Sequence, residues 1–327
     1  MNAVRMAGSI LFKACALAAL LAGAAQAQDV YPSRPVRIIV PFPAGGGTDT
    51  VTRIIAQKVQ ESVKQTVIVE NRPGGNTIIG AEAVARATPD GYTLLAAIDS
   101  TMAMNPSLYA KLSYDPFKDF APITLATSYP LILEATPAFP AKNLAELIAV
   151  VKAGAGKVSF AYPALPSQVA TELFKAVVGG IEFIGVPYKG GAPAMQDIMA
   201  GQVQLVFDAL GPSLPHLKSG KVKPFAVTSK QRSKAMPDVP TFAELGYPGM
   251  EMITWVGFLA PAGVRPDIVT RLNGEFVRAL AQQDVRDRFG SLGIDIHASS
   301  PEEFARQIRS DADKFDRIIK SAGIKVE

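Results

Sequence analysis

The sequence has 327 residues, of which 33 are Lys or Arg and 29 are Asp or Glu, giving a formal net charge of +4. So balanced a charge argues against a nucleic-acid-binding or membrane-surface protein. The length is sufficient for two domains, each with its own hydrophobic core.

Residues 1–27 have the pattern of a cleavable secretory signal. Arg5 and Lys13 precede the apolar run "ACALAALLAG", which is too short to span a bilayer, and Ala25-Gln26-Ala27 fits the small-x-small cleavage site. Cys15 is the sole cysteine, so we expect a mature chain, 28–327, with no disulfide, thiolate catalysis or cysteine metal site. The segment carries two basic and no acidic residues, which makes the expected mature charge +2.

Strand and helix patterns then alternate along the chain. Strands are predicted at 36–40, 66–70, 92–98, 158–162, 182–188, 203–209 and 222–229, and helices at 49–63, 77–87, 143–153, 167–178, 192–200, 214–220, 266–282, 284–291 and 301–322. Repeated strand–helix units with short turns predict an α/β fold with mainly parallel sheets flanked by helices.

Two long extended runs, 121–135 and 252–261, interrupt this alternation. We interpret them as two hinge strands that connect two α/β domains, the first formed by 28–128 and 255–327 and the second by 129–254. One large sheet with two edge strands is the alternative.

The sequence offers little for catalysis. Neither His216 nor His297 has a suitably placed Ser or Asp partner, and no G-x-S-x-G motif is present. No metal-ligand spacing such as H-x-x-x-H or an Asp-rich calcium loop occurs, so we expect no metal and no cofactor. An enzyme is therefore disfavoured.

A glycine-rich turn, "PAGGGTDT", joins the first strand to the first helix. It lacks both the G-K-[ST] of a phosphate loop and the spacing G-x-G-x-x-G, which argues against a nucleotide site. Gly45, Gly46 and Gly47 allow successive backbone N–H groups to face one anion, although tight packing of the turn is an equally simple explanation. We expect Asp49 to cap the helix and the glycine and Thr48 amides to face a ligand.

Other polar residues follow the predicted strands, where α/β sheets bind their ligands. Each of these residues taken singly also fits an ordinary cap or turn. Together they predict one cleft, in which Ser167 and Gln168 present a second set of amides at the start of their helix. The residues that follow the strands are Asp99, Ser100, Thr101, Ser167, Gln168, Tyr188, Lys189 and Asp208.

Several long segments are similar to one protein family, the Bug-type (TctC-like) periplasmic substrate-binding proteins of tripartite tricarboxylate transporters. The similarity extends from Tyr31 to about Gly323. It is carried by "RPVRIIVPFPAGGGTDTVTRIIAQKV", "VIVENRPGGNTIIGAEAVARATPDGYTLL", "NPSLYAKLSYDPFKDFAPIT", "VPYKGGAPAMQDIMAGQVQLVFD" and "LPHLKSGKVKPFAVTSKQRSKAMPDVPTFAE".

The resemblance implies a two-domain Venus-flytrap fold of type II-like periplasmic binding proteins, which closes on one organic carboxylate and delivers it to membrane permease subunits. It implies a monomeric periplasmic receptor that binds no nucleic acid, with the carboxylate held by the turn 43–48. The candidate ligand-binding residues are Phe42, Pro43, Ala44, Gly45, Gly46, Thr48, Asp49, Ser100, Thr101, Tyr162, Ser167, Gln168, Tyr188 and Asp208.

The sequence departs from the family pattern in its second half. The loop "PALPSQ" has two prolines and no glycine, and Gln168 and Met102 stand where the family often has histidine, while Ala209 follows Asp208 in place of asparagine. Because prolines remove backbone donors, we expect this half-site to offer fewer amides. We infer a ligand with one strongly recognised carboxylate and a more apolar or differently polar far end, which disfavours citrate.

Two other functions fit less well. A signalling receptor of the same fold would recognise its ligand identically and differ only in its outer surface. A periplasmic hydrolase requires a nucleophile and base, and the sequence supplies no such pair.

Overall fold

The computed structural model describes residues 31–154 and 156–325, and the predicted signal peptide lies outside the described residues. The strands are β1 (Val36–Val40), β2 (Val67–Asn71), β3 (Thr93–Ile98), β4 (Phe120–Ala135), β5 (Ser159–Tyr162), β6 (Ile184–Pro187), β7 (Leu205–Ala209), β8 (Lys223–Val227), β9 (Ile253–Pro261) and β10 (Asp295–Ile296). The helices are α2 (Gly47–Val63), α3 (Ile78–Ala85), the π-helix η1 (Ser100–Met104), α4 (Asn105–Leu108), α5 (Leu144–Gly154), α6 (Leu165–Val178), α7 (Gly191–Ala200), α8 (Leu210–Lys218), the 3₁₀-helix η2 (Pro248–Met250), α9 (Pro266–Ala281), α10 (Gln283–Ser291) and α11 (Pro301–Ser321).

The strands form two groups that share β4. The amino-terminal sheet has the order β2-β1-β3-β9-β4-β10, and only the pairs β1–β2 and β1–β3 are parallel. The middle sheet has the order β8-β4-β7-β5-β6, and only β5 makes parallel pairs. Both sheets are therefore mixed rather than mainly parallel, because β9 pairs antiparallel with β3 and β4, and β4 pairs antiparallel with β7 and β8.

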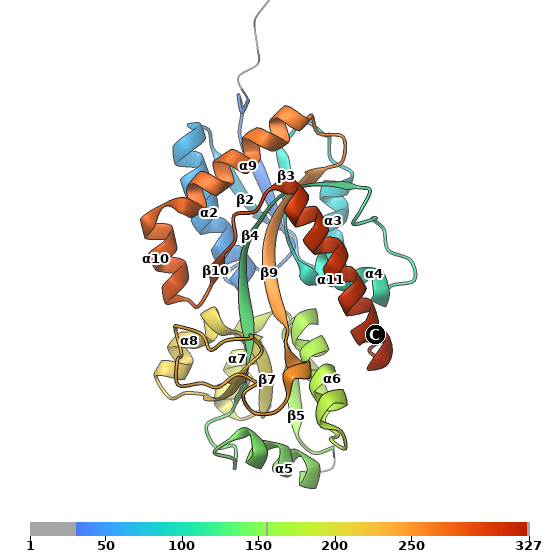
Figure 1. Ribbon diagram of the computed structural model, residues 1–327, viewed down its shortest axis with the longest axis vertical. Helices are drawn as coiled ribbons and strands as arrows, with labels where there is room; N and C mark the ends of the chain where they lie inside the picture. The colour runs from blue at the N-terminus through green and yellow to red at the C-terminus, as the bar shows by residue number, and fades with distance from the viewer. Residues whose placement is uncertain (1–30, 155, 326–327) are drawn as a thin grey trace, which may run out of the picture. The chain divides into compact units, whose positions relative to one another are not determined.

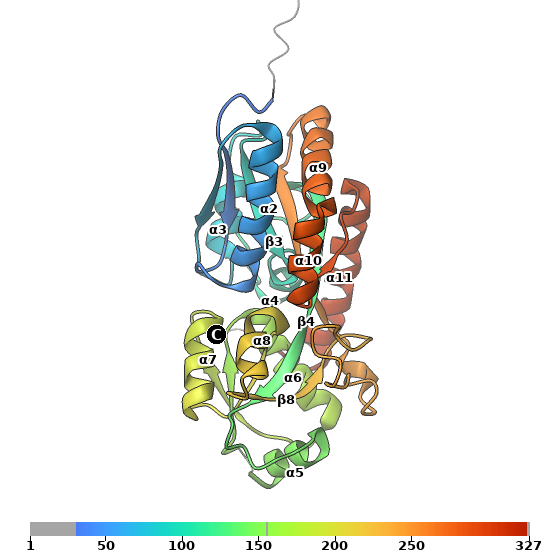
Figure 2. The same cartoon turned by 90° about the vertical axis from the view of Figure 1, so that its left-hand side faces the viewer.

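Strand β4 runs through both sheets (Figures 1 and 2). Up to Pro130 it pairs with β9, and from Leu131 onward it pairs with β7. The second connection lies just before β9, since Met252 N–H donates to Thr228 O at 3.0 Å and Ile253 already pairs with Pro130. The two predicted extended runs are thus confirmed as strands, while the domain boundaries stay a prediction.

Helices cover both faces of each sheet, as alternating side chains require. In the amino-terminal sheet Ile39, Leu95 and Leu259 face a cluster with α3 and α11. On the opposite face of this sheet Phe258 stacks on Phe276 of α9 with ring centroids 4.3 Å apart. Glycine at position 257 is required because a Cβ there would lie 2.1 Å from Phe304 Cζ. The amino-terminal sheet is therefore closely packed under α11.

The middle sheet is covered by α5 and α6 on one face and by α7 and α8 on the other. Leu133 and Phe207 belong to the first core, whereas Ile132 and Val206 belong to the second, in strict alternation along β4 and β7. Stacked and edge-on rings of Phe160, Phe174, Phe207 and Phe242 fill the first core.

The last helix, α11, contributes to both cores. It begins with a capping box in which Ser300 Oγ accepts from Glu303 N–H and Glu303 accepts from Ser300 N–H. Phe304 packs in the core of the amino-terminal sheet, and Phe315 packs in the core beneath α5 and α6. The described residues contain no helix that is both long and apolar enough to cross a membrane.

Candidate functional site

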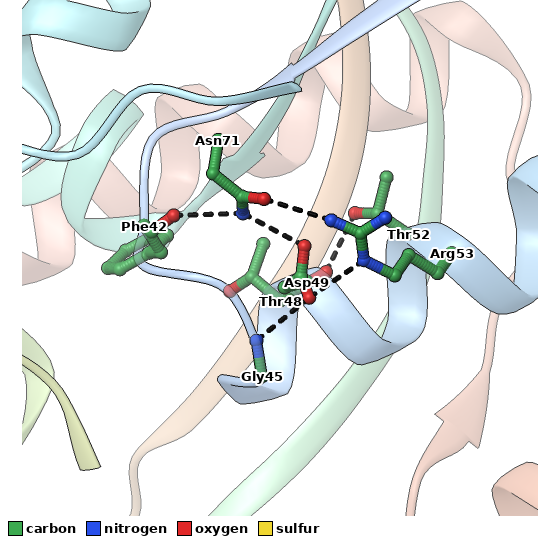
Figure 3. A network of polar contacts seen from close by, with 7 residues as sticks. All are labelled: Phe42, Gly45, Thr48, Asp49, Thr52, Arg53 and Asn71. Atoms are coloured by element: carbon green, nitrogen blue, oxygen red, sulfur yellow. Dashed lines mark hydrogen bonds and ion pairs between the residues drawn. The ribbon is translucent and has the colours of Figure 1, made fainter. Parts of the chain in front are cut away.

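The glycine turn after β1 is held by a network centred on Asp49 (Figure 3). Asp49 Oδ2 accepts from Gly45 N–H and from Arg53 Nε, both at 2.9 Å, and Oδ1 accepts from Asn71 Nδ2 at 2.8 Å. Asn71 also donates to Phe42 O at 3.0 Å. The buried Asp49 carboxylate therefore fixes the turn from inside.

Burial alone would raise the pKa of Asp49, but hydrogen bonds from Arg53, Gly45 and Asn71 outweigh burial and lower it. The Asp49 carboxylate is thus ionised, and both of its oxygens accept hydrogen bonds from the protein. The helix actually begins at Gly47 with Gly46 as its N-cap, so Asp49 is the third helical residue and not the N-cap itself. The prediction that the Gly45 amide faces a ligand is wrong, because Asp49 takes that amide.

The amides that stay available belong to the first turn of α2. Helix geometry gives the N–H groups of Gly47 and Thr48 no partner within the helix. A Cβ on Gly47 would lie 3.8 Å from Tyr129 Oη, 3.9 Å from Pro212 Cγ and 4.0 Å from Ala209 Cβ, so this glycine faces the middle sheet. In the described part of the chain neither N–H donates to another backbone group. The start of α2 therefore presents these donors and the positive end of a helix dipole to the space between the sheets.

That space is a cavity of about 580 Å³. Its walls come from the turn after β1 on one side and from the loops after β5, β6 and β7 on the other, with β4 and β9 at the base. The lining residues are Phe42–Thr48, Ile98, Tyr129, Leu131, Pro163, Ala164, Pro166, Ser167, Lys189–Pro193, Met195, Asp208, Ala209, Pro212, His216 and Thr254. A neighbouring cavity of about 460 Å³ shares Phe42, Pro43, Pro163, Ala164, Lys189 and Gly190 with it.

Asp208 is the buried acid in the cavity wall. It lies near the end of β7 and is 8% exposed, and its Oδ1 accepts from Ala209 N–H at 2.8 Å. Burial raises the pKa of Asp208 to about 6, against the lowering effect of that hydrogen bond. Burial likewise raises the pKa of Glu134, which is buried on β4 and accepts from Ser213 Oγ at 2.7 Å.

The predicted ligand-binding residues fall into three groups. Those that line the main cavity are Phe42, Pro43, Ala44, Gly45, Gly46, Thr48, Ser167 and Asp208. Ser100 and Tyr188 line the neighbouring cavity. Asp49, Thr101, Tyr162 and Gln168 line neither of these cavities.

The last group is turned away for identifiable reasons. Tyr162 Oη donates to Glu172 at 3.0 Å, and its ring lies over Gly185 of β6. Gln168 donates to Lys325 O at 3.2 Å, and Thr101 is buried inside η1. The prediction of a second set of free amides is also wrong, because Ser167 and Gln168 N–H both donate to Ala164 O.

Sequence reasoning missed several lining residues, above all Tyr129, Thr254 and the prolines of the middle sheet's helices. Tyr129 and Thr254 pair with each other across β4 and β9. Both strands are buried along almost their whole length, so their sequence carries no alternation that would show which side chains face a ligand.

A family model, the tripartite tricarboxylate transporter family receptor (TctC), matches residues 51–324. The chain belongs to this receptor family. The protein BugT of Bordetella pertussis is 36% identical over 302 residues, which cover 91% of this chain and 92% of BugT.

Solved structures agree with this assignment. The periplasmic binding protein BugD is 36% identical with a TM-score of 0.86, covering 91% of this chain and all of BugD. Rpa4515 of R. palustris, solved with adipate, is 33% identical with a TM-score of 0.87, covering 90% of this chain and 99% of Rpa4515. The fold is thus the two-domain α/β fold of periplasmic binding proteins, and the family is one of solute-binding receptors.

Proposed function

We propose that this TctC-family receptor captures a small organic carboxylate in the periplasm and passes it to the permease of a tripartite transporter. In this proposal the protein acts as a non-enzymatic monomer, exported with a signal at 1–27. Residues 28–128 with 255–327 form one domain and 129–254 the other, and the ligand lies between them.

The observation that carries the proposal is the start of α2 at the cavity. Its first-turn amides have no intrahelical partner, and the acid closest to them, Asp49, is neutralised by Arg53 and occupied by Gly45 and Asn71. A helix N-terminus whose own acid is already paired is suited to a carboxylate. The adipate-bound neighbour supports the same class of ligand.

The test is binding of carboxylates to the purified protein and to Gly47→Val, followed by thermal shift and calorimetry. A ligand at about 100 times its dissociation constant adds about 2.7 kcal/mol, enough for a shift of several degrees. In Gly47→Val the side chain fills the space between α2, Tyr129 and Pro212, so we expect affinity to fall by more than about tenfold.

Gly290→Val is the matched control, because Gly290 lies in α10, is exposed and has no heavy atom within 4 Å of an added Cβ. Equal affinities for the protein, Gly47→Val and Gly290→Val would remove the start of α2 from the site. No binding of any carboxylate by the folded protein would refute the proposed function.

A further inference from the structure

The two walls of the cavity differ in the donors that they offer. On the middle sheet's side the helices α6, α7 and α8 all begin at the cavity, and each has a proline in its first turn: Pro166, Pro193 and Pro212. Proline has no N–H, so each helix loses one of the donors that an anion would need. The first turns of these three helices therefore offer fewer backbone donors than helices without proline would.

The remaining surface of this wall is mostly apolar. Ala164, Ala192, Ala209, Met195 and Leu131 line it together with the three prolines. Such a surface suits the hydrocarbon body of a ligand, whose burial contributes roughly 25 cal/mol per Å². It gives a second carboxylate little compensation for lost hydration.

Asp208 is the acidic residue in this wall, which also contains the polar side chains of Ser167, Lys189 and His216. One of its oxygens is bonded to Ala209 N–H, and among the described residues no hydrogen bond or ion pair reaches the other. The free oxygen lies next to α7, where a Cβ on Gly191 would be 3.4 Å from it. A side chain at this position would therefore contact the carboxylate on that side.

The titratable groups around Asp208 do not neutralise it. Tyr129 and Glu134 on β4 are themselves acids, while Lys189 in the loop before α7 is exposed. His216 of α8 lines the same cavity. Neither Lys189 nor His216 forms an ion pair with Asp208 in the described part of the chain. Within the described residues no protein group donates to Oδ2, so a ligand that brings a donor adds a hydrogen bond to this cavity-lining carboxylate.

We propose that Asp208 is a specificity-determining residue that accepts a hydrogen bond from an ammonium or hydroxyl group at the far end of a carboxylate ligand, and that it disfavours ligands with a second carboxylate there. This inference rests on the proposed function, because it assumes that α2 holds the first carboxylate. Two carboxylates at one end of the cavity repel each other, whereas an ammonium or a hydroxyl gives Asp208 the donor that the protein does not supply.

Two matched ligand series test the inference by calorimetry at about pH 7. One consists of hexanoate, its ω-hydroxy and ω-amino derivatives and adipate, together with the next shorter and longer homologues. The other consists of benzoate and its para-hydroxy, para-aminomethyl and para-carboxy derivatives. We expect the hydroxy or amino member of the preferred series to bind at least about tenfold more tightly than the diacid of the same length.

Asp208→Asn is the decisive variant, since it keeps a carbonyl oxygen at the same place but removes the charge. We expect the ammonium preference to fall by about tenfold and the diacid to gain affinity. Asp238→Asn makes the same charge change at an exposed residue that lines neither cavity, and it should leave every ratio unchanged.

The outcomes separate the two proposals. Diacids that bind as tightly as the amino and hydroxy acids, or ratios that Asp208→Asn does not change, overturn the role of Asp208 while carboxylate capture stands. Failure of both complete series to bind overturns both. Loss of binding in Gly47→Val together with a changed preference in Asp208→Asn supports both.

Discussion

Replacing Asp208 with asparagine should make the ligand-free protein more stable at neutral pH. In the folded protein burial raises the pKa of Asp208 from 3.8 to about 6. A difference of about 2 pKa units corresponds to roughly 3 kcal/mol of unfolding free energy. The folded state binds the proton more tightly than the unfolded state, so this carboxyl costs little stability below about pH 4, and the cost grows as pH rises through about 6.

Asparagine keeps an oxygen that can accept the Ala209 amide but carries no charge at any pH. The unfolding free energy of Asp208→Asn minus that of the parent should therefore be near zero at about pH 4 and reach roughly 3 kcal/mol at about pH 7. Asp99 is also buried with a raised pKa, but its pKa does not depend on Asp208, so it cancels in this difference. The Asp208 charge helps to raise the pKa of Glu134, so its removal should further stabilise the variant at neutral pH.

The measurement is urea unfolding of both proteins at several pH values between about 4 and 7, followed by circular dichroism. At about pH 7 the thermal midpoint of the variant should be higher by roughly 5 °C. A stability difference that does not change with pH, or a variant that is less stable at neutral pH, would refute the reasoning. Asp238→Asn serves as the control for a change of net charge.

Two further substitutions probe how the site is supported. Gly257→Ala should destabilise the protein by about 1–3 kcal/mol, because the added Cβ would lie 2.1 Å from Phe304 Cζ. Thermal unfolding measures this change, and an unchanged midpoint would show that Phe304 moves freely to make room. Asn71→Ala removes the hydrogen bonds to Phe42 O and Asp49, so it should cost about 1–2 kcal/mol of stability and lower carboxylate affinity several-fold in calorimetry. Unchanged affinity would show that the turn keeps its shape without Asn71.

The sequence predicted the order of the elements well where periodicity and turns are strong. Helix α11 was expected at 301–322 and spans Pro301–Ser321, and the glycine turn does open onto a cavity. The start of α6 was placed two residues late, because Pro166 was assigned to the loop, although proline fits the first turn of a helix. That shift explains why Ser167 and Gln168 were expected to have free amides.

Other misses depend on contacts that one strand cannot show. Tyr162 ends β5, so it was expected at the cleft, but its ring covers Gly185 of the neighbouring strand β6. Which strand lies beside β5 is a tertiary property, as is the pairing of β4 with both β7 and β8. The side of the sheet on which the Tyr129 side chain lies likewise depends on the register of β4 with β9.

The buried carboxylate of Asp208 connects stability with selectivity. Within the described residues no protein group donates to its second oxygen, and the prolines of α6, α7 and α8 reduce the donors that the surrounding helices supply. A ligand that donates a hydrogen bond to Asp208 and accepts hydrogen bonds from the amides of α2 contacts residues of both sheets. It therefore favours the conformation in which both cavity walls contact it. A diacid can accept hydrogen bonds from α2 with one carboxylate, but its second carboxylate is repelled by the carboxylate of Asp208. Asp208→Asn should therefore be more stable and at the same time discriminate less between amino or hydroxy acids and diacids, since the Asp208 carboxylate determines both properties.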